Sequence, residues 1–120
     1  KKELFVVNDK LGTPTYTHDF ARNVRLLLEK EFWGLYNMVC NGNTGRFEVA
    51  QELIQVMSLK DKVKVTPVLS EYWKDEYFAD RPPSERLINR KLDARGLNVM
   101  RDWRICLREY IATYYQDYLK

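Results

Sequence analysis

Apolar residues recur along the first part of the chain in two patterns, one typical of a strand and one of a helix. Residues 4–7 form a β-branched and aromatic run, which predicts a strand that ends in an Asn-Asp turn. From Thr17 the apolar positions return every three or four residues, which predicts a helix that runs as far as Gly34. Thr17 or Asp19 is the predicted cap of its first turn.

The middle of the chain repeats this alternation. Residues 35–40 alternate in part and predict a second strand. A helix is predicted next, with Thr44 as its N-cap and an apolar stripe that reaches Met57. Residues 63–68 alternate like a half-exposed strand, and Pro67 favours a sheet edge because proline has no N–H to donate.

The next segment is rich in aromatic residues and proline. Residues 70–79 predict one or two helical turns, and the proline pair at 82–83 fixes an extended backbone after them. Asn89 is the predicted N-cap of a short helix over 90–95.

The final helix begins after Asp102, its predicted N-cap, and carries an aromatic stripe that includes Trp103. Such a stripe favours a place in the core over a platform that stacks on a ligand. The alternation of short strands with about four helices predicts a small mixed α/β domain.

Composition describes an ordinary globular domain. A chain of 120 residues fits one domain, which buries roughly 65% of its surface on folding. Its 20 Lys and Arg against 17 Asp and Glu are interspersed, and a net charge of +3 does not predict a nucleic-acid partner. No apolar run reaches the roughly 18 residues of a membrane span, and the first residues do not begin a signal peptide. We expect a cytoplasmic protein, and the absence of an initiator Met suggests a piece of a longer one.

Cys40, Cys106 and His18 are weak candidates for chemistry. The two cysteines lie in apolar runs at unrelated spacing, which favours small buried thiols in a reducing compartment. With the single histidine they cannot complete a four-ligand zinc site, so no metal is predicted. His18 precedes Asp19, but no nucleophile motif accompanies the pair and a helix N-terminus disfavours the imidazolium form.

Two loops are stronger candidates for binding. Residues 12–17 bring a glycine, a proline and three threonine hydroxyls to a helix N-terminus, where free N–H groups favour an anion or a sugar. A simple capped turn is the alternative. Arg81 stands before the stiff proline pair, which suits bidentate binding of phosphate, although a solvated basic surface explains the same charges.

Residues 6–17 read VVNDKLGTPTYT and residues 19–21 read DFA. They resemble the V-V-x-D-Q-x-G-x-P-T-Y-T-x-D-L-A segment of the dTDP-4-dehydrorhamnose reductase family, a branch of the extended short-chain dehydrogenases/reductases. The later blocks of that family follow in the same order: GLYN at 34–37, NG at 41–42, FEVA at 47–50, RP at 81–82, KL at 91–92, GL at 96–97 and WRxxL at 103–107. The resemblance therefore covers nearly the whole chain.

The resemblance implies a C-terminal substrate-binding lobe. In that family an N-terminal Rossmann domain binds NADPH or NADH and supplies the catalytic Thr or Ser, Tyr and Lys. Neither a glycine-rich dinucleotide loop nor a Tyr with Lys four residues later occurs in this chain, so no catalytic or cofactor-binding residue is assigned to it. The partners implied are that missing domain, a dTDP-sugar and a second copy of the longer protein.

Five residues take substrate-binding roles by this resemblance. Gly12, Pro14 and Thr15 are expected to shape the turn on the substrate side, and Arg81 to face the diphosphate. Lys10 stands where the family usually has Gln and is expected to add charge toward the diphosphate or to change a hydrogen bond near the sugar. Ser84 and Glu85 stand where Asn and Ser are common.

The expected function is the substrate-binding part of a reductase that transfers hydride to the C4 keto carbon of dTDP-6-deoxy-L-lyxo-4-hexulose and yields dTDP-L-rhamnose. The 120 residues alone are expected to bind the sugar nucleotide weakly and to reduce nothing. Two alternatives remain open: the lobe of another nucleotide-sugar epimerase or dehydratase, and a non-catalytic regulatory subunit of the same fold.

Overall fold

The structure is a computed structural model that describes residues 2–76 and 79–118. Its sheet has two parallel strands, β1 (Lys2–Val7) and β2 (Val63–Val68), paired along their whole lengths. The strands predicted at residues 4–7 and 63–68 are confirmed. Pro67 lies at a sheet edge as expected, because among the described residues each strand has one neighbour.

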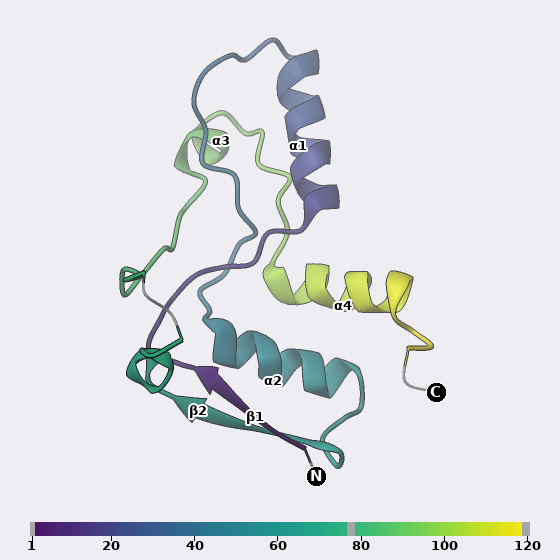
Figure 1. The fold of residues 1–120 in the computed structure, drawn as a ribbon. Coiled ribbons are helices and arrows are strands. Elements are labelled where there is room, and N and C mark those ends of the chain that lie inside the picture. The colour runs from purple at the N-terminus through teal and green to yellow at the C-terminus, as the bar shows by residue number, and fades with distance from the viewer. Residues whose placement is uncertain (1, 77–78, 119–120) are drawn as a thin grey trace.

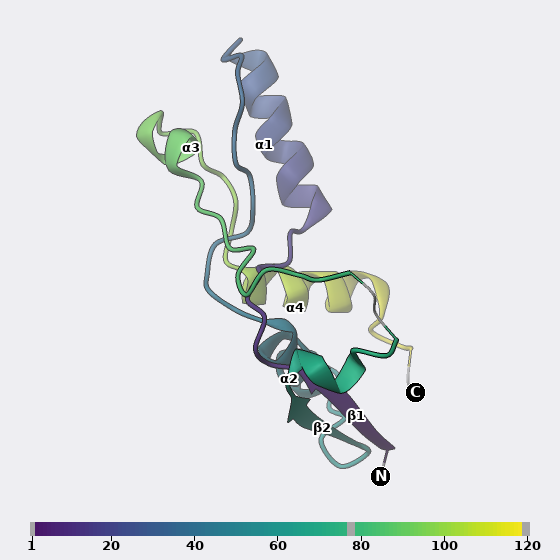
Figure 2. The same cartoon turned by 60° about the vertical axis from the view of Figure 1, so that its left-hand side comes forward.

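Within the described residues, four α-helices and one 3-10 helix complete the fold. In chain order they are α1 (Thr17–Glu29), α2 (Arg46–Val56), the 3-10 helix η1 (Ser70–Trp73), α3 (Arg90–Ala94) and α4 (Trp103–Tyr114). Helix α2 contacts both strands and α4, whereas α1 and α3 rise together away from the sheet (Figure 1). Figure 2 shows α4 between these two parts from a second direction. None of the helices in the described ranges is both long and apolar enough to span a membrane.

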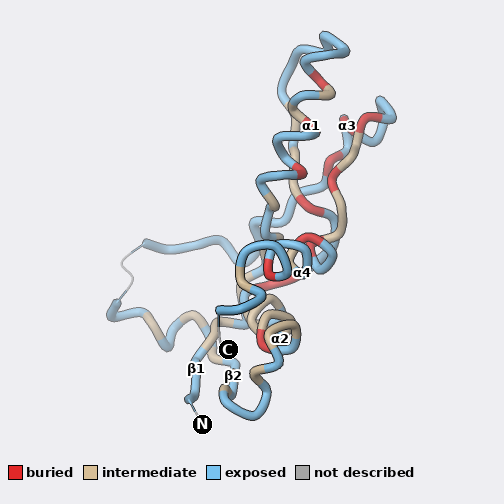
Figure 3. Tube along the Cα trace, turned by 90° about the vertical axis from the view of Figure 1, so that its right-hand side faces the viewer, coloured by how far each residue is buried: buried red, intermediate tan, exposed pale blue. Residues whose placement is uncertain are grey.

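The buried residues gather around α4 and between α1 and α3, and the residues of the two strands are exposed or intermediate (Figure 3). One cluster contains Cys40, Met100, Trp103 and Cys106. A second cluster contains Leu27, Leu92 and Leu97. The core is therefore built by helices and by the two extended segments 38–41 and 97–101, which confirms Trp103 as a core residue.

The predicted strand at 35–40 is wrong, because this segment is extended but joins no sheet. Its backbone is satisfied by a side chain instead of a neighbouring strand: the Val39 N–H donates to Asn89 Oδ1 at 2.9 Å, and Asn89 Nδ2 donates to the Val39 carbonyl at 2.7 Å. The same two bonds explain why Asn89 occupies the N-cap position of α3 without capping it.

Other predicted helix ends also differ from those in the structure. Helix α1 has Tyr16 at its N-cap position with no side-chain cap, and it ends at Glu29 instead of reaching Gly34. Thr44 does not cap α2, whose N-cap position belongs to Gly45. Among the predicted N-caps, only that of α4 is confirmed, since Asp102 accepts a hydrogen bond from the Arg104 N–H at 2.9 Å.

The aromatic segment 70–79 lies partly outside the described residues. Its first residues form η1, which agrees with the predicted helical turn.

Candidate functional site

The two loops that the sequence singles out lie side by side. Lys10 Nζ donates to the Arg81 carbonyl at 2.8 Å. Beside it, the Leu11 N–H donates to the Pro83 carbonyl and the Leu11 carbonyl accepts from the Glu85 N–H, each at 2.9 Å. The chain after β1 therefore runs along the Arg81 loop as a short stretch of paired backbone.

A third loop, which the sequence analysis does not include in the site, joins them. The Gly12 N–H donates to the Thr44 carbonyl at 3.0 Å, and Thr13 Oγ1 donates to the Gly42 carbonyl at 2.8 Å. The signal in the sequence is the run NGNTG at 41–45, whose two glycines permit close approach of backbones. We call residues 10–13, 41–45 and 81–85 together the three-loop junction.

Gly45 is where two loops of the three-loop junction approach each other closely. A Cβ at this position would lie 2.8 Å from the Lys10 carbonyl oxygen, an atom of the backbone that cannot rotate away. Gly45→Ala is therefore expected to lower the free energy of unfolding by about 1 to 3 kcal/mol, as other overpacked sites do. Urea denaturation measures this loss.

Gly12→Ala is the matched control, because a Cβ on Gly12 meets nothing within 4 Å. Its effect on stability should lie within about 0.5 kcal/mol of zero, as for surface substitutions in general. If both variants unfold at the same urea concentration, the close approach at Gly45 does not constrain the three-loop junction.

The five substrate-binding candidates lie in the three-loop junction or directly after its first loop. Pro14, Thr15 and Arg81 are exposed, and Lys10 and Gly12 are half-buried.

One carboxylate lies close to the expected anion-binding group. Arg81 Nη1 is 3.7 Å from Glu85 Oε1, and both side chains are more than half exposed. Such a pair is weak, so the guanidinium stays available to an anion that competes with Glu85. The departure at position 85 from the family pattern thus places an acidic competitor beside Arg81.

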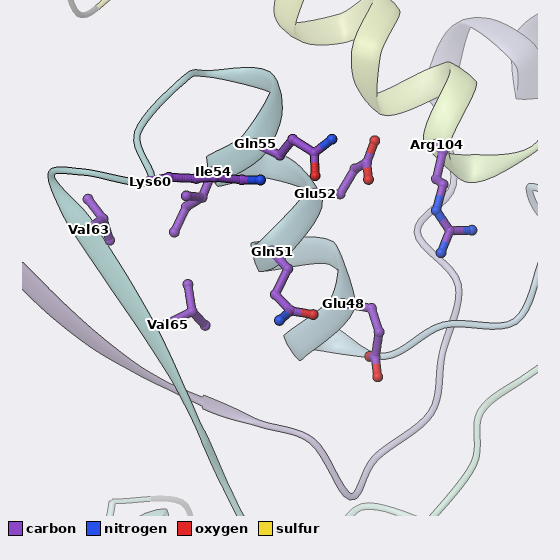
Figure 4. A pocket seen from close by; sticks show the side chains of 9 residues that line it. All are labelled: Glu48, Gln51, Glu52, Ile54, Gln55, Lys60, Val63, Val65 and Arg104. Atoms are coloured by element: carbon purple, nitrogen blue, oxygen red, sulfur yellow. The ribbon is translucent and has the colours of Figure 1, made fainter.

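Two cavities lie elsewhere in the described part of the chain. The first, about 420 Å³, opens between α2, β2 and the start of α4 (Figure 4). Its lining residues are Glu48, Gln51, Glu52, Ile54, Gln55, Lys60, Val63, Val65 and Arg104. The second, about 450 Å³, lies beside α3 and is lined by Leu35, Asn37, Arg90, Lys91 and Ala94. Neither cavity includes any of the five substrate-binding candidates.

An ion-pair network around the buried Asp19 carboxylate anchors the first turn of α1. The Asp19 carboxylate is fully buried and accepts from Arg101 Nη2 at 2.7 Å and from the Arg101 N–H at 3.0 Å. Arg101 Nη2 also lies 2.7 Å from Glu109 Oε2 on α4. Asp19 is therefore an anchor between α1 and α4 and not the helix cap that the sequence suggests.

The interactions in this network lower the pKa values of its two carboxylates. Burial by itself would raise the pKa of Asp19, but the hydrogen bonds from Arg101 outweigh it and hold that pKa below the usual range. Hydrogen bonds from Arg101 also lower the pKa of Glu109. Both carboxylates consequently remain charged in the folded state at neutral pH.

His18 belongs to an aromatic group at the other side of this turn. Its ring stacks on Tyr16 with the ring centres 4.9 Å apart, and its Nε2 lies 2.8 Å from the Tyr114 hydroxyl. These contacts connect the start of α1 to the end of α4.

Three comparisons show what the chain is similar to. The family model described as the RmlD substrate binding domain matches residues 1–116. The spore coat polysaccharide biosynthesis protein SpsK of Bacillus subtilis (strain 168) is 32% identical over 111 residues, which are 92% of this chain and 37% of that protein.

Solved structures agree with the family match. A dTDP-4-dehydrorhamnose reductase of Clostridium acetobutylicum ATCC 824 is 33% identical with a TM-score of 0.87, over 93% of this chain and 39% of that one. The dTDP-4-dehydrorhamnose reductase of Bacillus anthracis str. Ames in complex with NADP is 27% identical with a TM-score of 0.83, over 95% of this chain and 38% of that one. The chain thus spans less than two fifths of the length of each of these relatives.

Proposed function

Because the chain belongs to the family of RmlD substrate binding domains, we propose that it is the substrate-binding part of a dTDP-4-dehydrorhamnose reductase. The family and the small mixed α/β fold agree with the sequence-based predictions. The observation that carries the proposal is the direct contact of two candidate loops, made by Lys10 Nζ and the Arg81 carbonyl. This contact places two cationic residues at one edge of the three-loop junction.

The proposed site has the chemistry that a sugar diphosphate needs. Arg81 offers a planar guanidinium for two phosphate oxygens. Lys10 Nζ donates one of its three N–H groups to the Arg81 carbonyl, so two remain for a ligand. Gly12, Pro14 and Thr15 form the adjoining turn. There the Thr15 hydroxyl and the backbone of Gly12 contact the sugar.

The residues of this chain do not fit a dinucleotide cofactor. It has five glycines, and none of them forms a G-x-G-x-x-G loop. Within the described ranges the sheet has two strands, fewer than a mononucleotide-binding half of a Rossmann fold contains. We therefore propose that the nicotinamide cofactor and the catalytic proton donor belong to a domain outside these residues, and that the 120 residues alone reduce nothing.

Binding titrations with the complete protein test this function. We expect dTDP-sugars to bind more tightly than UDP- and GDP-sugars, and the 120-residue chain to bind dTDP-sugar weakly without oxidising NADPH. Tighter binding of another nucleotide would assign the chain to a different nucleotide-sugar enzyme. Turnover of NADPH by the 120 residues alone would refute the division of labour between the two parts.

Arg81→Ala in the complete protein is expected to weaken dTDP-sugar binding by about 1.5 to 3 kcal/mol, the value of a charge-assisted bond. This corresponds to roughly 10- to 150-fold in Kd, which calorimetry can measure. Arg25→Ala is the matched control, since Arg25 lies on α1, outside the three-loop junction, and forms an ion pair with Glu29. It should leave Kd unchanged.

Glu85→Gln provides a test in the opposite direction. It removes the carboxylate that lies 3.7 Å from Arg81, so binding should become tighter. If the wild type and the variants at positions 81 and 85 bind dTDP-sugar with equal affinity, Arg81 does not contact the ligand and is part of a solvated basic surface.

A further inference from the structure

Cys40 and Cys106 form a pair of buried thiols that the proposed sugar-nucleotide site does not use. They are the two cysteines of the sequence, and they are separated by 66 residues. In the fold their Sγ atoms lie 3.7 Å apart, and the residues are 2% and 3% exposed. Cys40 belongs to the extended segment 38–41, and Cys106 lies in the first turns of α4.

Backbone hydrogen bonds hold the two cysteines in register. The Asn41 N–H donates to the Arg101 carbonyl at 3.0 Å, and the Trp103 N–H donates to the Asn41 carbonyl at 3.1 Å. These bonds fix the residue after Cys40 against the start of α4. A disulfide has an S–S distance of about 2.05 Å, so the sulfurs must approach by less than about 2 Å, which is within reach of side-chain rotation.

We propose that Cys40 and Cys106 are a reversible dithiol–disulfide pair that closes under oxidising conditions and cross-links the 38–41 segment to α4. With an organic disulfide such as oxidised glutathione, one cysteine attacks a glutathione sulfur and releases one reduced glutathione. The second cysteine then attacks the mixed disulfide and releases the other. The protein loses two hydrogens, and two glutathione thiols are formed.

The surroundings of the pair make the dithiol the stable form under reducing conditions. Cys106 Sγ donates to Asp19 Oδ2 at 3.3 Å, and Cys40 Sγ accepts from the Tyr16 N–H at 3.3 Å. Burial, together with the neighbouring Asp19 carboxylate, raises the pKa of the Cys106 thiol. Because the thiolate is the attacking species, closure is slow in the folded protein and responds to sustained oxidation.

A metal ion bound by the two cysteines and Asp19 is the alternative to a disulfide. One ligand atom each from Asp19, Cys40 and Cys106 lies within 4.8 Å of the others. The carboxylate, however, is already held by the Arg101 guanidinium at 2.7 Å. A cation would have to displace or tolerate that positive group, so the geometry favours the disulfide.

The cross-link would also reach the three-loop junction. Gly42, whose carbonyl accepts from Thr13 Oγ1, is two residues from Cys40.

The loop that the disulfide would close contains α2, β2 and α3. Constraining it in the unfolded chain is expected to raise the thermal midpoint by an amount on the order of 10 °C.

The test compares the purified protein after oxidised glutathione and after dithiothreitol at mildly alkaline pH, followed by alkylation in denaturant and peptide mapping. We expect a monomer with a Cys40–Cys106 cross-link, a loss of two hydrogens and a raised thermal midpoint that dithiothreitol reverses. Cys40→Ser and Cys106→Ser should form no internal cross-link and gain no stability from oxidation. Cys40→Ala and Cys106→Ala serve the same purpose if a buried serine prevents folding.

Three outcomes would overturn the proposal. The first is glutathione adducts or disulfide-linked dimers without the internal cross-link. The second is two thiols that both remain free after oxidation, even in mild denaturant. The third is protection of both thiols by a bound zinc ion that a chelator releases, since this would assign the same residues to a metal site.

Discussion

Trp103→Ala is expected to lower the free energy of unfolding by about 3 to 5 kcal/mol, the usual cost of deleting a large buried aromatic side chain. Trp103 is 1% exposed and packs with Cys40, Met100 and Cys106 in the cluster at the start of α4. Its removal leaves a cavity where segment 38–41 and α4 meet. Urea denaturation followed by circular dichroism measures the loss.

Trp103→Phe separates the ring from its polar group. Among the buried side-chain atoms of the described residues, Trp103 Nε1 has no hydrogen-bond partner, so phenylalanine keeps most of the apolar contact and breaks no hydrogen bond. It should cost less than half of the alanine effect. An alanine variant as stable as the wild type would show that this cluster does not support the fold.

Local signals were sufficient for the elements whose ends depend on neighbouring residues. Asp102 caps α4 as its position before an apolar stripe predicts. The alternating run at 63–68 forms β2, and the β-branched run at 4–7 lies within β1. In each case the residues that predict the element lie within it or directly before it, although β1 and β2 pair with each other from distant parts of the chain.

Distant partners decide the elements that the sequence did not predict. Asn89 reaches Val39, 50 residues away, and its side chain takes the place of a neighbouring strand. Asp19 is bound by Arg101, 82 residues away, although it also stands where a cap is expected. An asparagine or aspartate beside a helix start looks the same in sequence whether it caps that helix or binds elsewhere.

The candidate site shows the same division. Turn chemistry and charge selected Gly12 and Arg81, and resemblance to a family motif added Lys10, but the contact between Lys10 and Arg81 spans 71 residues and appears only in the fold. Loop 41–45 was missed because its part in the junction is made by backbone carbonyls of Gly42 and Thr44. Every residue carries such a carbonyl, so side-chain chemistry gives no sign of it.

Asp19→Asn is expected to destabilise the fold by roughly 1.5 to 3 kcal/mol, because it replaces the charge-assisted hydrogen bonds that Arg101 donates to a buried carboxylate with weaker neutral ones. The Asp19 carboxylate is 0% exposed and accepts hydrogen bonds from both the guanidinium and the backbone N–H of Arg101. Glu109→Gln is the matched control, since its exposed carboxylate pairs with the same guanidinium from the solvent side. It should cost much less.

The dependence of stability on pH identifies the charge on Asp19 as the cause. The folded protein holds the pKa of Asp19 below that of the unfolded chain, about 3.9. The unfolded state therefore binds more protons in acid, and the stabilisation that is complete well above this value is lost as the pH falls through the folded pKa. Asp19→Asn should flatten this acid-side slope in urea unfolding measured across the acidic range, and Glu109→Gln should leave most of it. If the variant at Asp19 keeps the full wild-type slope, other carboxylates carry the acid sensitivity, and the buried pair does not anchor α1 to α4 through its charge.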